Sequence, residues 1–176
     1  FYFCSLYVQT VWHVEPDVAG LLFLPFCVFI VLGIIAAGRL AKKIGARATI
    51  AAFGLLGALG LAAFSRMPAE FDFWLGILVP SLLTAVGIGG SMMLVGMAGT
   101  SGVAPADAGV ASGVLNSSRQ LGGTIGLAVL VTVAAHHDGL RAGYQAGLLV
   151  GAVLLAVGSV AAWLILPRSA TPDTQF

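Results

Sequence analysis

The segment GRLAKKIGAR, Gly38 to Arg47, lies between two strongly apolar stretches of the chain. It carries four of the eight Lys and Arg residues within ten positions. The stretch before it begins near Val18, and the stretch after it ends near Ser65. Apolar runs of about 20 residues separated by short charged connections are typical of a chain that crosses a lipid bilayer repeatedly. The basic segment therefore predicts one membrane crossing on each side of it.

The composition of the whole chain agrees with a membrane environment. The 176 residues are 59% hydrophobic and 9% charged, with a mean hydropathy of +1.04, whereas soluble domains are about 25% charged. So few charges cannot form the polar shell that a soluble domain of this length needs. The net charge of +1 gives no basic surface for a nucleic acid, so we expect a lipid bilayer as partner and no nucleic acid.

Five apolar segments are long enough to span a bilayer, and a sixth, at the start of the chain, is about half as long as a span requires. Gly, Ala, Val and Leu dominate them without the alternation of a β-barrel, which leaves helices as the structure that satisfies its own backbone in lipid. We expect an all-α polytopic bundle over residues 1–166 and a tail over 167–176. Because the start lacks Met and a signal-peptide pattern, we expect a fragment of a longer protein. The predicted helices cover residues 1–12 (partial), 18–38, 48–65, 73–98, 109–135 and 143–166.

The charges predict how the bundle is oriented. If each segment crosses once, the basic segment, residues 99–108 and the tail share one side of the membrane. That side holds Arg39, Lys42, Lys43, Arg47 and Arg168, whereas the other side holds Glu15, Asp17, Glu70, Asp72 and Asp138. Lys and Arg in short loops mark the cytoplasmic side. We therefore expect a multi-pass protein of the cell membrane with a cytoplasmic C-terminus.

The penultimate segment carries a polar face within its apolar sequence. Its spacing of three, four and seven residues places these side chains on one side of a helix: Ser112, Asn116, Arg119, Gln120 and Gly123. An Arg at the hydrocarbon centre costs about 2.5–3.5 kcal/mol, so this face should contact protein or water. Arg119 lies about 15 Å from the start of its helix. Two interpretations stay open: a structural strut bonded to backbone carbonyls, or a residue that lines a translocation path or pairs with a carboxylate.

Small residues predict close helix packing. The GxxxG spacing occurs twice, at Gly122 with Gly126 and at Gly147 with Gly151, and this spacing lets helix backbones approach in membranes. The sequence VGIGG, Val86–Gly90, follows no predicted strand, so we interpret it as a flexible or closely packed part of its helix and not as a phosphate loop. Pro25 and Pro80 lie early in their helices, where they either kink the helix or are simply tolerated.

Enzymatic, cofactor and metal functions have little support in the sequence. The chain shows no nucleophile–base pair, and we expect His136 and His137 to be solvated at a helix end and not part of a metal site. Cys4 and Cys27 lie within apolar runs, so we expect them to behave as small buried apolar residues and not to form a disulfide or a metal site. The five predicted spans contain no Asp or Glu, although proton-coupled transporters relay protons through such residues or His. A proton-coupling carboxylate would therefore lie outside this chain.

GRLAKKIGAR resembles the signature loop of the major facilitator superfamily, a family of membrane transporters. The match rests on Gly38, Lys43, Gly45 and Arg47, while Lys42 stands where the family has an Asp. In the family that Asp belongs to a charge arrangement that holds the two transporter halves together. Because Lys42 reverses its charge, we expect this copy of the loop to anchor the cytoplasmic face and not to form that latch.

Residues 105–130, PADAGVASGVLNSSRQLGGTIGLAVL, are similar to the penultimate helix of the fourteen-helix drug:proton antiporter branch of this superfamily. The resemblance implies the C-terminal six-helix half of a transporter, built as two inverted three-helix repeats. It implies efflux of drugs or other small amphipathic compounds, often cationic or lipophilic, in exchange for protons. The implied partner is a missing N-terminal half. The alternative is a membrane subunit or assembly partner without transport of its own, which a start codon directly upstream would favour.

Overall fold

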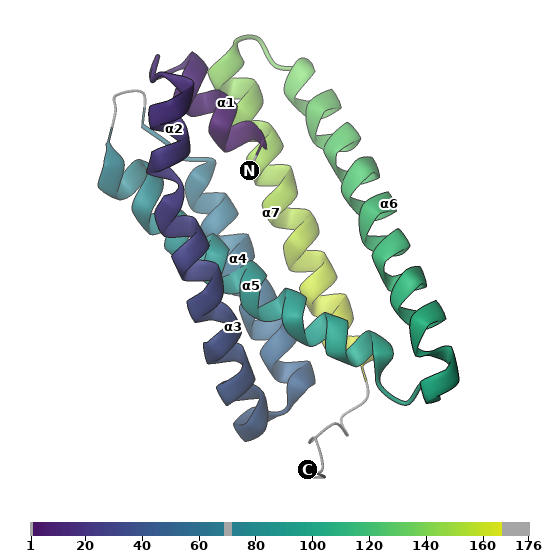
Figure 1. Cartoon of the computed structure of the whole chain (residues 1–176). Helices are drawn as coiled ribbons and strands as arrows, with labels where there is room; N and C mark the ends of the chain where they lie inside the picture. Colours follow the sequence, from purple (N-terminus) through teal and green to yellow (C-terminus); the bar gives the residue numbers. More distant parts are fainter. Residues whose placement is uncertain (1, 69–71, 167–176) are drawn as a thin grey trace.

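Helices account for all regular structure in the computed structural model, which describes residues 2–68 and 72–166 (Figure 1). This confirms the predicted all-α polytopic bundle, and the predicted tail, 167–176, lies outside the described residues. The elements in chain order are α1 (Tyr2–Thr10), α2 (Pro16–Leu22), α3 (Leu24–Ile44), α4 (Ala46–Phe64), the π-helix η1 (Phe73–Leu78), α5 (Val79–Thr100), the 3-10 turn η2 (Pro105–Asp107), α6 (Ala108–Ala135) and α7 (Leu140–Ile165).

Five helical stretches are long and apolar enough to cross a membrane. They cover Pro16–Ile44, Ala46–Phe64, Phe73–Thr100, Pro105–Ala135 and Leu140–Ile165. Each corresponds to one predicted segment, and most boundaries differ by a few residues. Helix α1, with nine residues, occupies the place of the predicted partial segment.

The basic segment Gly38–Arg47 is helical, which corrects its prediction as a loop. Helix α3 continues through Lys42 and Lys43 to Ile44, and α4 begins at Ala46. Lys and Arg are good helix formers, and a helix C-terminus favours positive charge in its last turn. The connection therefore shrinks to Gly45, whose φ of +85° suits a residue without Cβ. Its N–H donates to the Ala41 carbonyl at 2.9 Å, which closes the last turn of α3.

The two prolines lie at junctions between helical segments. Pro25 is in the first turn of α3, after the break from α2 at Phe23. Pro80 is in the first turn of α5, directly after η1. A missing N–H costs little in a first turn. The first and third spans therefore each consist of two helical pieces.

Helix α5 packs closely against both α3 and α4. A Cβ built on Gly87 would overlap the backbone of Gly57 in α4, and one built on Gly89 would overlap the backbone of Ile30 in α3. On the facing helices, a Cβ built on Gly33 would overlap the backbone of Val86, and one built on Gly60 would overlap Thr84. Of the two interpretations of the VGIGG sequence, the structure therefore supports the closely packed part of a helix.

The remaining helices pack around this centre. Helix α7 packs along α4, where Gly54 faces Ser159. The short α1 belongs to an aromatic cluster at one end of the bundle, in which Phe3, Tyr7 and Phe64 are buried. Helix α6 lies at the edge of the bundle (Figure 1) and, alone among the five spans, has no buried residue.

The connections divide between the two ends of the bundle in agreement with a single crossing per span (Figure 1). The α3–α4 junction, the α5–α6 connection and the end of α7 lie at one end. The α1–α2 and α6–α7 connections, the end of α4 and the start of η1 lie at the other. Arg39, Lys42, Lys43 and Arg47 are therefore at the first end, and Glu15, Asp17, Asp72 and Asp138 at the second.

The α4–α5 contact predicts a specific loss of stability. We expect Gly87→Ala to lower the free energy of unfolding by about 1–3 kcal/mol, because the added Cβ would meet backbone that cannot rotate away. Gly158→Ala in α7 is the matched control, since a Cβ there meets nothing within 4 Å. Unfolding of the purified protein in mixed micelles by a denaturing detergent measures both changes. Equal effects of the two substitutions would contradict the close α4–α5 contact.

Candidate functional site

The predicted polar face lies on α6, and most of it is exposed. Ser112, Asn116, Gln120 and Gly123 are exposed, whereas Arg119 is half-buried. Asn116, Arg119 and Gln120 lie near the middle of the 28-residue helix, far from both ends. A polar face of this kind in a spanning helix is unfavourable against lipid. The structure therefore brings the predicted residues together on one helix but covers only Arg119 in part.

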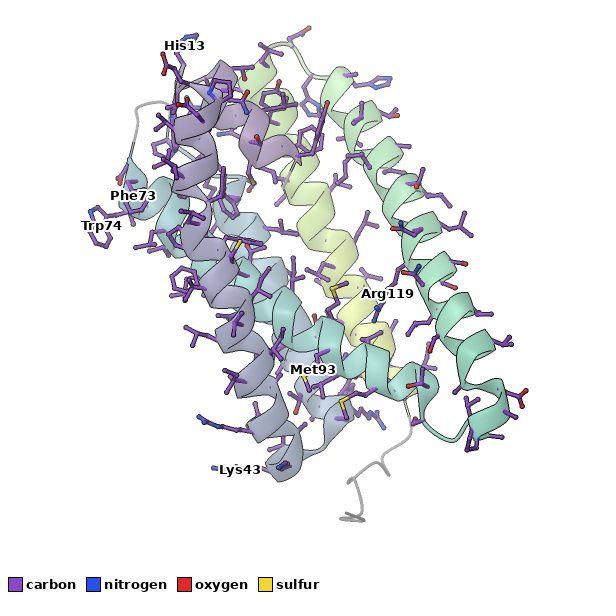
Figure 2. The ribbon with its side chains drawn as sticks, in the orientation of Figure 1. His13, Lys43, Phe73, Trp74, Met93 and Arg119 are labelled. Atoms are coloured by element: carbon purple, nitrogen blue, oxygen red, sulfur yellow. The ribbon has the colours of Figure 1, made fainter. Side chains whose placement is uncertain are left out.

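Arg119 is held by a backbone carbonyl of α5. Its Nη2 donates a hydrogen bond to the Met92 oxygen at 3.2 Å, and Figure 2 shows the side chain pointing from α6 toward the rest of the bundle. The guanidinium reaches this carbonyl because Gly96, one turn further along α5, has no side chain. A Cβ on Gly96 would lie 3.2 Å from Nη2.

This contact is of the kind that the strut interpretation expects. One hydrogen bond to a charged donor is worth about 1.5–3 kcal/mol, which is of the same order as the cost of placing the arginine in the membrane. The bond uses one of the five N–H groups of the guanidinium. The other interpretation, a residue on the translocation path, stays a prediction.

A shallow groove, which residues of α6 alone line and which is open on its other side, follows the polar face along this helix. Its volume is about 610 Å³, and the threonine hydroxyls in it donate to carbonyls of their own helix, that of Thr124 to Gln120 at 2.9 Å and that of Thr132 to Ala128 at 2.8 Å. The groove therefore presents methyl and methylene groups beside the Gln120 amide. Its lining consists of Gln120, Gly123, Thr124, Leu127, Ala128, Val131 and Thr132.

The two GxxxG pairs differ in their surroundings. A Cβ on Gly147 would lie 3.3 Å from the Leu130 oxygen and from the Phe3 ring, and one on Gly151 would lie 3.7 Å from the Leu130 side chain. These two glycines face α6. A Cβ on Gly122 or Gly126 meets nothing within 4 Å, so the packing role predicted for that pair has no contact in the described chain and stays a prediction.

The basic segment holds α4 and α7 together at one point. The Arg47 guanidinium carbon lies 5.0 Å from the centroid of the Trp163 ring, which is within the range of a cation–π interaction. Gly38 and Gly45 are half-buried, whereas Arg39, Lys42 and Lys43 are exposed. The anchoring role predicted for Lys42 therefore stays a prediction. The sequence analysis missed the Arg47–Trp163 contact because nothing in the sequence indicates that α7 ends beside the start of α4.

A second group of contacts that the sequence analysis missed lies at the opposite end of the bundle. The Tyr7 hydroxyl donates to the carbonyls of Met67 and Pro68 at 3.2 and 3.1 Å, and Trp12 Nε1 donates to Pro68 at 3.1 Å. Arg141 Nη2 and Gln145 Nε2 from α7 also reach the Met67 oxygen, both at 3.4 Å. Backbone carbonyls are the acceptors, so no residue pattern could reveal this group.

The structure shows no candidate metal centre in the described residues. No cluster of three or more His, Cys, Asp or Glu side chains occurs among residues 2–68 and 72–166. Nδ1 of His136 and Nδ1 of His137 lie 2.8 and 2.9 Å from carbonyls of the preceding turn of α6. Both rings are exposed, so they interact with their own helix end and with solvent.

The α5–α6 contact predicts a proximity that Arg119 maintains. A Cβ on Gly99 would lie 3.2 Å from Leu115, so we expect Gly99→Cys and Leu115→Cys to be joined by a short bifunctional thiol reagent. Adding Arg119→Leu should lower the yield, because the only side-chain hydrogen bond between α5 and α6 in the described chain is lost.

The background for this measurement carries Cys4→Ala and Cys27→Ala, and a protease site in the connection 101–104 makes the cross-link visible on a gel. Gly99→Cys with Val114→Cys is the matched control, since Val114 is 62% exposed. A yield that does not change on removal of Arg119 would show that this arginine does not hold the helices together.

Comparison with known proteins assigns the chain to a family. The family model of the Major Facilitator Superfamily matches residues 1–176. The cephamycin export protein CmcT of Amycolatopsis lactamdurans is 40% identical over 133 residues, which cover 75% of this chain and 27% of that protein. The puromycin resistance protein pur8 of Streptomyces alboniger is 32% identical over 185 residues, which cover 94% of this chain and 37% of that protein.

A third relative is the tetracenomycin C resistance and export protein of Streptomyces glaucescens. It is 31% identical over 144 residues, which cover 78% of this chain and 26% of that protein. The chain thus spans between a quarter and two fifths of the length of these curated relatives. No solved structure matches it. The match over its full length and the membrane-spanning helices show that the chain belongs to the Major Facilitator Superfamily.

Proposed function

We propose that this chain is part of a secondary transporter that exports small amphipathic compounds across the cell membrane. The observation that carries the proposal is the exposed polar face of α6 within an apolar spanning helix, in a chain of a transporter family. Such a face needs water, a polar ligand or further protein beside it. The names of the relatives, which are export or resistance proteins for cephamycin, puromycin and tetracenomycin C, support efflux as the direction of transport.

The packing of the bundle supports transport by alternating access. Helices α3, α4 and α5 meet at backbone-to-backbone contacts, so they would move as one unit. In transporters of this type, one bundle rocks against another around a site near the middle of the membrane. The length of the relatives leaves room for a second bundle, which we propose as the N-terminal partner half. The α6 face would then border the substrate path between them.

We further propose proton coupling and membership of the fourteen-helix drug:proton antiporter branch. Both follow from the similarity of residues 105–130 to that branch. The acidic residues of the described chain lie at helix ends and in connections: Glu15, Asp17, Asp72, Asp107 and Asp138. None is in the middle of a span, so the coupling carboxylate would belong to the partner half.

The proposed function predicts proton-dependent efflux. Cells that express the full-length protein should accumulate less of an amphipathic dye, such as ethidium, than cells with an empty vector. Collapse of the proton gradient by an uncoupler should abolish the difference, because outward transport would lose its driving force. Efflux that persists without a proton gradient would contradict the coupling, and equal accumulation for a panel of dyes would contradict export.

The proposed orientation places the basic end of the bundle in the cytoplasm, since Lys and Arg in short connections stay on that side. In a background without native cysteines, a membrane-impermeant maleimide should label Asp138→Cys in intact cells and Lys43→Cys only after permeabilisation. Both positions are exposed at opposite ends of the bundle, so the two variants control for each other. Labelling of Lys43→Cys in intact cells would contradict the orientation.

A further inference from the structure

Arg119 is the one charged residue in the middle of a spanning helix in the described part of the chain. The other basic residues of the described chain lie in the first turn or the last two turns of a helix or in connections: Arg39, Lys42, Lys43, Arg47, Arg66 and Arg141. A cation in the membrane interior is costly unless an anion or strong acceptors surround it. The described chain therefore contains an unusual positive charge whose environment needs to be explained.

No carboxylate of the described residues can neutralise this charge. Asp107 is the nearest along α6, but it precedes Arg119 by twelve positions, which correspond to about 18 Å of helix. The other acidic residues that the structure describes, Glu15, Asp17, Asp72 and Asp138, lie at the opposite end of the bundle. Within the described residues only the Met92 carbonyl accepts from the guanidinium, and a neutral acceptor leaves the charge uncompensated.

The bond to Met92 also orients the guanidinium. It fixes Nη2 against α5, in the space that the missing side chain of Gly96 provides. A planar guanidinium held on one side presents its remaining N–H groups on the other, and this geometry suits bidentate bonding to a carboxylate. Arg119 is half-buried, so part of the group stays accessible.

Neighbouring groups add neutral polar contacts and an apolar surface. Asn116 and Gln120, three residues before and one after Arg119, are exposed, and their side chains make no hydrogen bond within the described residues. The shallow groove along α6 begins at Gln120 and continues with small and aliphatic side chains. This part of the molecule therefore combines one fixed positive charge, two amides and a nearby surface for an apolar body.

We propose that Arg119 is an anchor for the carboxylate of an amphipathic substrate, with Asn116 and Gln120 as additional polar contacts. This inference rests on the proposed export function and narrows its substrate class from amphipathic compounds in general to those with an anionic group. It differs from the sequence-based expectation of cationic compounds, because the described spans offer a positive charge and no negative one in the membrane interior.

The test compares two dyes that differ only at the carboxyl group: a rhodamine with a free phenyl carboxyl and its methyl ester. Efflux of each is measured from cells that express the full-length protein. We expect Arg119→Gln to lower efflux of the free acid about tenfold or more, since a charge-assisted pair is lost. Efflux of the ester should stay within about twofold of the wild type, because the ester has no carboxylate to pair with the guanidinium. Arg119→Lys should retain part of the efflux of the acid.

Arg66→Gln is the matched control, because Arg66 is exposed after the end of α4 and its loss removes the same charge elsewhere. Immunoblots of membrane fractions normalise efflux to the amount of protein. If Arg119→Gln lowers the efflux of both dyes equally, Arg119 has only a structural role, and the proposal that it anchors a carboxylate is wrong. A wild type that exports the ester alone would overturn the anchor but leave the proposed function standing. Export of neither dye would overturn both.

Discussion

The close backbone contact of α5 with α3 and α4 is the constraint on which the rest of the bundle depends. In lipid, helices gain nothing from removing apolar side chains from water, so association relies on van der Waals contact between surfaces that fit. Gly57 against Gly87 and Gly89 against Ile30 supply such surfaces because no Cβ separates the backbones. Two crossings of this kind on opposite sides of α5 fix three helices relative to one another.

Helices α7 and α6 attach to this unit in different ways. Helix α7 follows α4 and is tied to its surroundings at both ends, by Trp163 with Arg47 at one end and by Arg141 with the Met67 carbonyl at the other. Helix α6 contacts α7 mainly through Leu130 and Ala134 and contacts α5 through Leu115 and Arg119. It has no buried side chain, so its position depends on a few contacts.

The sequence predicts the number and type of the spans well and their ends and partners less well. Apolar length alone identifies the five spans, because lipid demands about 20 such residues in a helix. The charged residues wrongly predict that the helix ends near Gly38. Helix α3 continues to Ile44, because Lys42 and Lys43 are compatible with a last helical turn. The GxxxG spacing finds Gly147 but not Gly87, because close contact depends on which helix lies opposite and not on spacing within one helix.

The sequence predicts the polar face of α6 but not what surrounds it, because the face depends on one helix and the surroundings depend on another. Helical periodicity places Asn116, Arg119 and Gln120 together without any knowledge of the fold. What Arg119 contacts depends on Gly96 in another helix, whose missing side chain opens the way to the Met92 carbonyl. This single bond joins the least buried helix to the most tightly packed one. A large movement of α6 relative to α5 would therefore break this bond, so a ligand that pairs with the other N–H groups of the Arg119 guanidinium would also act on the attachment of α6.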